Sequence, residues 1–209
     1  MAERQFLSIG YESVTMESIA RESGVAKQTL YSHFGSKREL FLALVTAKTE
    51  AAAKSVLSPA PRIIDAGSAR SQLRDVLVAQ LSAVMTSEMI ALRRLVIGEM
   101  TRSPELARAL YEHGPRQAVN SLAAVVAEMN ELGVVRIEHV HQAATHLNWL
   151  VMGEPVNRAM LIGDSGIPSP PEIEAQVDAA LDVFFNAFGT MEDTGGASSA
   201  PTRIPRHRS

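Results

Sequence analysis

The stretch of residues 15–40, TMESIARESGVAKQTLYSHFGSKREL, limits the possible fold of this chain more than any other part of the sequence. Apolar residues at helical spacing predict a first short helix behind a threonine cap, and a second with Leu30 and Phe34 on one face. Gly24 lies between them, where a tight turn needs the left-handed conformation that glycine adopts readily. We expect Val25 to anchor the start of the second helix. Together these features predict a helix-turn-helix.

The polar side chains left outside the second helix can all donate a hydrogen bond to a phosphate or a base edge. They are Lys27, Gln28, Thr29, Tyr31 and His33. The chain as a whole has 20 Lys and Arg against 23 Asp and Glu, but the segment 24–38 holds three cations and no acid. Because salt confines each charge to a range of about 8 Å, the local sign decides phosphate contacts. We therefore interpret this helix as a recognition helix for the major groove of DNA.

The run IAxxxGVAKxTLYxHFxxKxxL, from Ile19 to Leu40, resembles the N-terminal signature of the TetR family of transcriptional regulators. Gly10, Tyr11 and Thr15 extend the match upstream. The resemblance implies an all-α fold, with a three-helix helix-turn-helix domain in residues 1–48 and a helical effector-binding and dimerisation domain in residues 49–189. Residues 190–209 are rich in Gly, Ser and Pro, so we expect a disordered tail, solvated rather than bound to DNA through its arginines.

Within this interpretation, the side chains of the recognition helix divide into two roles. Lys27 and Gln28 are the predicted base contacts, since Lys suits guanine and Gln suits adenine, and Thr29 suits a thymine methyl or a phosphate. The predicted phosphate contacts are Tyr31, His33, Lys37 and, from its helix cap, Thr15. Ala26 occupies the N-cap position where the family often has Ser, so the recognition helix lacks a side-chain cap.

Helical periodicity continues through the rest of the chain. The predicted helices run from Lys37 towards Val56, over 69–86 and 87–100, from Ser103, over 115–133, from Glu138 to about Leu161 and up to Phe188. We expect Ser58–Pro61 to end the first of these and Pro155 to kink the sixth. The segment VVRI at 134–137 is too short to establish a sheet.

The last helix carries an apolar stripe that must be covered by its own domain or by another copy of the chain. The stripe consists of Ile173, Val177, Ala180, Leu181, Phe184 and Phe188. In TetR-like proteins two C-terminal helices of each subunit form a four-helix dimer bundle, so the resemblance implies a homodimer. The segment MGEPVNRAML, at 152–161, resembles an AefR-like subgroup.

Methionine and tryptophan in the central helices suggest a pocket for a small-molecule effector, because methionine adapts to varied apolar ligands. The candidate effector residues are Met89, Arg93, Met129, Trp149 and Met152. Met85, Met100, Tyr111 and His113 have the same potential, and core packing is the alternative for each of these apolar residues. Arg93, Arg94 and Glu99 suit either a pocket or a solvated helix face.

No catalytic or metal-binding pattern emerges from the sequence, so we expect neither an enzyme nor a cofactor. Cysteine is absent, and neither an HExxH motif nor a GxSxG elbow occurs. His139, His141 and His146 lie two and five residues apart, and such spacing turns helical side chains in different directions.

The sequence thus predicts a homodimeric, effector-released transcriptional regulator, more consistent with a repressor, that binds a pseudo-palindromic double-stranded operator. The alternative is a helical small-molecule-binding or protein-interaction module without DNA binding. No apolar run is long enough to span a bilayer and no leader opens the chain, so we expect a cytoplasmic protein with no membrane partner. Because TetR-like first helices begin further upstream, we also expect the natural start to precede Met1, which intact-mass measurement would test.

Overall fold

The computed structural model describes residues 1–57 and 66–190, with the side chains of 54–57 left out. All regular structure in these ranges is helical, which confirms the predicted all-α class. In chain order the elements are α1 (Ala2–Ile9), α2 (Met16–Ser23), α3 (Lys27–Phe34), α4 (Lys37–Leu57), α5 (Ala69–Val84), α6 (Ser87–Glu99), α7 (Pro104–His113), α8 (Pro115–Glu131), α9 (Val140–Ile162), the 3-10 turn η1 (Asp164–Gly166) and α10 (Pro170–Phe188). The expected break at Ser58–Pro61 and most of the predicted tail lie outside the described residues.

Helices α2 and α3 form the predicted helix-turn-helix, and local signals explain its geometry. The Thr15 hydroxyl accepts a hydrogen bond from the Ser18 N–H (3.1 Å) and the Ser18 hydroxyl accepts one from the Thr15 N–H (3.2 Å), which makes a reciprocal capping box. Gly24 ends α2 in the left-handed conformation, with φ 68° and ψ 20°. The side chain of Val25 is 40% exposed, so its predicted anchoring role is wrong; the Val25 N–H instead donates to the Ala20 carbonyl (3.0 Å).

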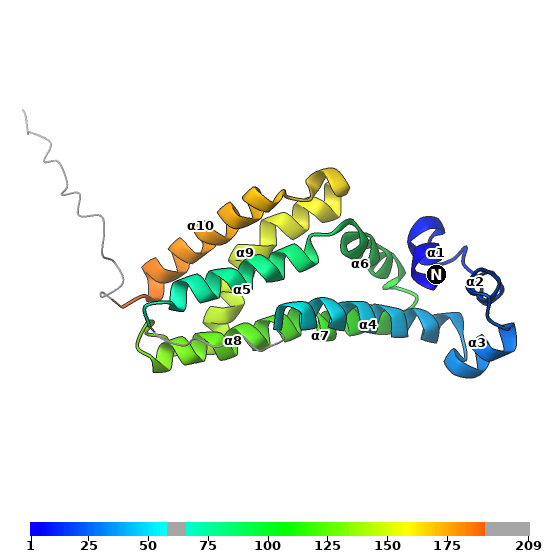
Figure 1. Cartoon of the computed structure of the whole chain (residues 1–209), viewed down its shortest axis with the longest axis horizontal. Helices are drawn as coiled ribbons and strands as arrows, with labels where there is room; N and C mark the ends of the chain where they lie inside the picture. Colours follow the sequence, from blue (N-terminus) through cyan, green and yellow to red (C-terminus); the bar gives the residue numbers. More distant parts are fainter. Residues whose placement is uncertain (58–65, 191–209) are drawn as a thin grey trace, which may run out of the picture.

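The N-terminal end of the molecule has its own hydrophobic core, in which the Phe6, Ile19 and Phe41 side chains are fully buried. This core does not end with α4. Leu92 and Val96 of α6 belong to it, together with residues of α7. Figure 1 shows α1–α3 at one end of the elongated molecule, with α4 running from them alongside α7. The helix-turn-helix module is therefore built onto α6 and α7.

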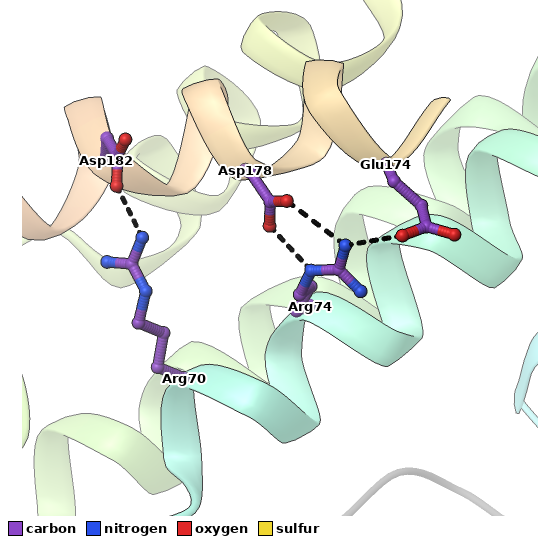
Figure 2. Close-up of polar contacts among 5 residues, drawn as sticks. All are labelled: Arg70, Arg74, Glu174, Asp178 and Asp182. Atoms are coloured by element: carbon purple, nitrogen blue, oxygen red, sulfur yellow. Dashed lines mark hydrogen bonds and ion pairs between the residues drawn. The ribbon is translucent and has the colours of Figure 1, made fainter. Parts of the chain in front are cut away.

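A second, larger core lies among α5, α8, α9 and α10. The apolar stripe of α10 packs into it, so this stripe is covered within its own chain. On their polar sides, α5 and α10 are joined by ion pairs: Arg70 contacts Asp182, and Arg74 contacts Glu174 and Asp178 (Figure 2). Any dimer contact made by α10 would therefore involve a face other than these two.

The remaining expectations for the fold concern α9 and the connecting segments. Pro155 lies inside α9, which continues past it. The segment 134–137 makes an isolated antiparallel bridge, Val135 to Gly189, in agreement with the expectation that it does not establish a sheet. No single helix in the described ranges is long and apolar enough to cross a membrane; α5 and α6 pass that test only as a pair, and they meet at a 63° bend.

Candidate DNA interface and effector cavity

The recognition helix α3 turns its apolar side inward and its polar side outward. Leu30 is buried and Phe34 is half-buried against the N-terminal core. The five predicted DNA-contacting residues of α3 all have exposed side chains, namely Lys27, Gln28, Thr29, Tyr31 and His33. Ala26 is the N-cap and makes no side-chain capping bond. The helix can therefore present these side chains to a groove, although its own start is weakly fixed.

Lys27 is not free on this surface. Its ammonium forms an ion pair with Glu17 of α2 and lies 5.6 Å from the centre of the Tyr31 ring. The hydrogen bond from Glu17 raises the pKa of Lys27, and the same bond lowers the pKa of Glu17. Both partners are exposed, so such a pair is weak and a DNA base or phosphate can replace the carboxylate.

The two predicted DNA contacts outside α3 have different surroundings. Thr15 is exposed at the start of α2, where its hydroxyl oxygen caps the helix. The Lys37 ammonium donates to the backbone carbonyls of Tyr11 (2.8 Å) and Glu12 (3.2 Å) and lies over the Tyr11 ring, 4.5 Å from its centre. Lys37 thus ties the α1–α2 loop to the first turn of α4, and its predicted phosphate contact remains a prediction.

A cavity of about 450 Å³ lies in the larger domain, lined mostly by apolar side chains from α4, α5, α6, α8 and α9. Its volume is in the range of small-molecule sites, about 300–1,000 Å³. Gly114, in the turn between α7 and α8, allows α4 to come close. A Cβ there would lie 2.9 Å from the Thr49 methyl group and 2.8 Å from the Leu110 carbonyl oxygen.

The structure brings four of the five predicted effector residues to this cavity: Met89, Arg93, Trp149 and Met152. The fifth, Met129, is not among the lining residues; it is fully buried in the larger core. Met85, Met100, Tyr111 and His113 do not line the cavity either, and His113 instead pairs with Glu50 (3.2 Å). Effector binding by the lining residues remains a prediction.

Several polar groups of the cavity were not predicted from the sequence. The Gln80 amide nitrogen donates to the Asn148 amide oxygen (3.2 Å), a buried pair that joins α5 to α9. Ser121 and Asn157 also line the cavity. A polar residue within the apolar face of a helix could have indicated these positions. The sequence does not show, however, which apolar face borders a cavity and which packs into the core.

The adjacent arginines of α6, left undecided by the sequence, have separate environments. Arg93 lines the cavity. Arg94 points to the end of α9, where its Nε donates to the Met160 carbonyl (2.9 Å). Glu99 is buried near the N-terminal core, 3.9 Å from Arg102. Successive residues of a helix point about 100° apart, which explains the divergence.

Helix α6 connects the cavity with the DNA-binding end. Arg93 and Ile97 line the cavity, whereas Leu92 and Val96 are buried in the N-terminal core. Met89 does both, since it lines the cavity and packs against that core. A ligand in the cavity would therefore touch the helix on which the helix-turn-helix module is built.

The histidines of α9 give no metal site in the structure. His139, His141 and His146 lie near one another at the start of the helix, and His141 is 3.4 Å from the Asn120 amide oxygen. Within the described ranges no group of three or more His, Cys, Asp or Glu side chains is arranged to hold a metal ion.

A helix-turn-helix with an exposed polar recognition helix, joined through α6 to a cavity-bearing helical domain, is the architecture of a transcriptional regulator. Comparison with known proteins gives the family. Residues 71–190 match the domain described as "AefR-like transcriptional repressor, C-terminal domain", and residues 1–44 match "Bacterial regulatory proteins, tetR family". The chain belongs to the TetR family, whose members are non-enzymatic DNA-binding proteins that act as homodimers.

Solved structures support the same assignment over nearly the whole chain. A TetR-family transcriptional regulator from Mesorhizobium loti is 30% identical, with a TM-score of 0.80 over 90% of this chain and 93% of that one. The flavonoid-responsive regulator FrrA is also 30% identical, with a TM-score of 0.72 over 91% of this chain and 94% of that one.

The curated relatives match over shorter stretches. YezE, an HTH-type transcriptional regulator of Bacillus subtilis, is 29% identical over 106 residues, 49% of this chain and 53% of that protein. The HTH-type transcriptional activator FasR of Mycolicibacterium smegmatis is 46% identical over 44 residues, 21% of this chain and 20% of that protein. The match therefore spans about half of YezE and a fifth of FasR.

Proposed function

We propose that this protein is a transcriptional repressor, acting on chromosomal DNA in the cytoplasm, that binds a pseudo-palindromic operator as a homodimer. A small molecule in the cavity releases it from the DNA. The main observation behind this proposal is the position of α6. One side of this helix lines the cavity, and the other side packs into the core of the helix-turn-helix module. An effector that fits only one position of α6 favours the conformer with that position and so shifts the population.

On the DNA, Lys27 and Gln28 contact bases and Thr29 contacts a thymine methyl or a phosphate. Tyr31, His33, Lys37 and Thr15 contact phosphates. The exposure of α3 and the weak hold of Glu17 on Lys27 support this assignment. Lys37 has a second task, because its ammonium already fixes the α1–α2 loop. Two-fold symmetry sets the two half-sites about 10 bp apart, or at a multiple or modest variant of that distance.

For the dimer, we propose the outward face of α10 with the neighbouring part of α9. Small and apolar exposed side chains follow one side of α10, namely Ala175, Ala179, Val183 and Ala187. On α9, the exposed apolar side chains are Trp149, Leu150, Leu161 and Ile162. Small side chains let two helices approach closely, as a four-helix bundle between two copies requires.

The relatives support the direction of regulation and the type of effector. The C-terminal domain matches one described as a transcriptional repressor, whereas the short N-terminal match to FasR is to an activator. The longer match favours repression. FrrA, by its name, responds to flavonoids, which shows that a chain with this fold and 30% identity can sense an organic molecule.

The test is selection of bound DNA from random sequence with the full-length protein, followed by binding measurements on the selected site. We expect the selected sequence to be two-fold symmetric. In each of Lys27→Ala and Gln28→Ala, the preference in binding free energy for the selected site over unrelated DNA should fall by about 1–3 kcal/mol. Arg108→Ala, at an exposed position of α7, is the control and should bind as the wild type does.

Two outcomes would refute parts of this proposal. Unchanged selectivity in both α3 variants would refute the assignment of the base contacts. A protein that enriches no sequence and shows no salt-dependent DNA affinity would instead be a helical ligand-binding or protein-interaction module.

A further inference from the structure

The cavity contains a single charged residue among its described lining residues, and that residue is a cation. Arg93 projects from α6, and no Asp or Glu is among the other lining residues. Its Nε atom is buried and has no hydrogen-bond partner among the described residues. Burial lowers the pKa of its guanidinium, but arginine still stays protonated at physiological pH. A partly buried guanidinium, with its Nε atom unpaired, therefore faces the cavity, and no acidic residue among the described lining residues balances its charge.

The other partly buried arginines of the described chain show how unusual this is. Arg70 contacts Asp182 (2.5 Å), and Arg74 contacts Asp178 (2.6 Å) and Glu174 (2.9 Å), as Figure 2 shows. Arg158 lies 3.6 Å from Glu154 and donates to the Gly166 carbonyl (3.1 Å). A partly buried guanidinium without an ion-pair partner costs free energy, so Arg93 suits an anionic partner from outside the chain.

The rest of the lining sets the chemistry of that partner. Met89, Met152 and Trp149 offer an adaptable apolar and aromatic surface. One guanidinium among the described lining residues can balance one negative charge, which disfavours nucleotides and other polyanions. The planar guanidinium fork matches a carboxylate, which it can bind through two parallel hydrogen bonds.

We propose that the effector of this protein is an amphipathic organic carboxylate, whose anionic group pairs with Arg93 while its apolar body fills the cavity. This inference rests on the proposed role of the cavity as the effector site and adds the ligand's chemical class. Gln80, Asn148 and Asn157 remain as neutral partners for further polar groups of the ligand. Since Arg93 lies on α6, the charge of the ligand acts directly on the helix that supports the DNA-binding module.

The test compares each carboxylate with its uncharged amide on the full-length protein. The probes are 2-naphthoate with 2-naphthamide, and decanoate with decanamide, so that the two pairs separate aromatic from aliphatic ligands. Trp149 lines the cavity and is the only tryptophan of the chain, so its fluorescence reports binding directly. We expect at least one carboxylate to bind about 10-fold or more tightly than its amide, as one hydrogen bond to a charged group provides.

Three variants assign that preference to the guanidinium. In Arg93→Met the preference should disappear while the affinity for the amide stays within about threefold, and Arg93→Lys should restore part of the preference by returning the positive charge. Arg108→Met removes an arginine from the exposed surface of α7 and should leave both affinities unchanged. The comparison of carboxylate and amide affinities in the wild-type protein needs no variant. The carboxylate proposal therefore stays testable even if Arg93→Met fails to fold.

The contrary outcomes separate this inference from the regulator proposal. Amides that bind as tightly as carboxylates, or a preference that persists in Arg93→Met, would overturn the carboxylate proposal alone. Failure of every probe to change the Trp149 emission would also overturn it. Selection of operator DNA is independent of these ligands, so failure there would refute the regulator proposal instead.

Discussion

At the scale of single residues, the recognition helix is defined by its exposed polar side chains and by what holds its first turn. Thr15 and Ser18 cap α2 reciprocally, whereas Ala26 gives α3 no side-chain acceptor. Lys27, in the first turn of α3, is held by Glu17 of the preceding helix. Part of the order of α3 therefore comes from neighbours and not from its own sequence.

Ala26→Ser should strengthen the start of α3. Ala26 has the extended backbone of an N-cap (φ −61°, ψ 134°), so a serine hydroxyl there can accept a hydrogen bond from an otherwise unpaired N–H of the first turn. We expect the free energy of unfolding to rise by about 0.5–2 kcal/mol, measured by urea denaturation. Ala26→Val, which adds bulk without an acceptor, is the control; equal stability of the two variants would contradict the capping argument.

At the scale of elements, two contacts connect the parts of the molecule. Helix α6 packs into the N-terminal core through Leu92 and Val96 while its next face lines the cavity. Helix α5 holds α10 by ion pairs on one side and by the larger core on the other. In the proposed function, the first contact would transmit effector binding to the DNA-binding module, and the second would hold α10 in place for the proposed dimer.

Truncations on the two faces of α6 should differ in their effect on stability. Leu92→Ala truncates a side chain that is only 2% exposed, so we expect the free energy of unfolding to fall by about 2–5 kcal/mol. Ile97→Ala, on the cavity face with the side chain 50% exposed, should cost less than about 1 kcal/mol. Urea unfolding of both variants tests this, and equal losses would show that Leu92 is not part of a tightly packed core.

Arg74→Met should destabilise the α5–α10 contact only slightly near neutral pH, because the ion pairs are partly exposed and screened by solvent. Arg74 lowers the pKa of Asp178 from its ordinary 3.8. The stabilisation is therefore complete above that ordinary value and is lost as the pH falls through the lowered pKa. Between pH 7 and pH 2, the free energies of unfolding of the wild type and of Arg74→Met should become equal at the acid end. Arg108→Met is the control. A difference in the free energy of unfolding that grows on acidification would contradict the ion-pair account.

At the scale of the whole molecule, the monomer is elongated, with the DNA-binding module at one end and α9 and α10 in the other part (Figure 1). The apolar stripe of α10 is used up inside its own domain. The dimer surface that we propose consists of the outward face of α10 and the exposed apolar side chains of α9. A two-fold dimer on this surface repeats the same patch on both subunits.

Ala179→Arg should disrupt the dimer. Ala179 is exposed in the middle of the outward face of α10, and a long charged side chain there would keep the two copies of the helix apart and place like charges near the two-fold axis. We expect the wild type to sediment as a dimer at micromolar concentration, and the variant to sediment as a monomer and to lose operator binding. Ala51→Arg, exposed on α4, is the control; a dimeric Ala179→Arg variant would exclude this face.

Features that depend on short-range chemistry can be predicted from the local sequence. The Thr15 cap and the left-handed Gly24 set the limits of α2, and the spacing of apolar residues predicts both α2 and α3, because each signal acts within a few residues. The same holds for the helices after residue 68, whose limits differ from the predicted ones by a few residues at most. The family signature lies within this locally determined part.

Which residues meet across the chain depends on how the helices pack in three dimensions. The sequence predicts both Met129 and Met152 to be effector residues, yet Met129 is buried in the core and Met152 lines the cavity. Arg93 and Arg94 are adjacent, and only the rotation of α6 between two cores places one at the cavity and the other at the end of α9. Such assignments depend on how whole helices rotate and pack against one another, which periodicity in a single helix does not define.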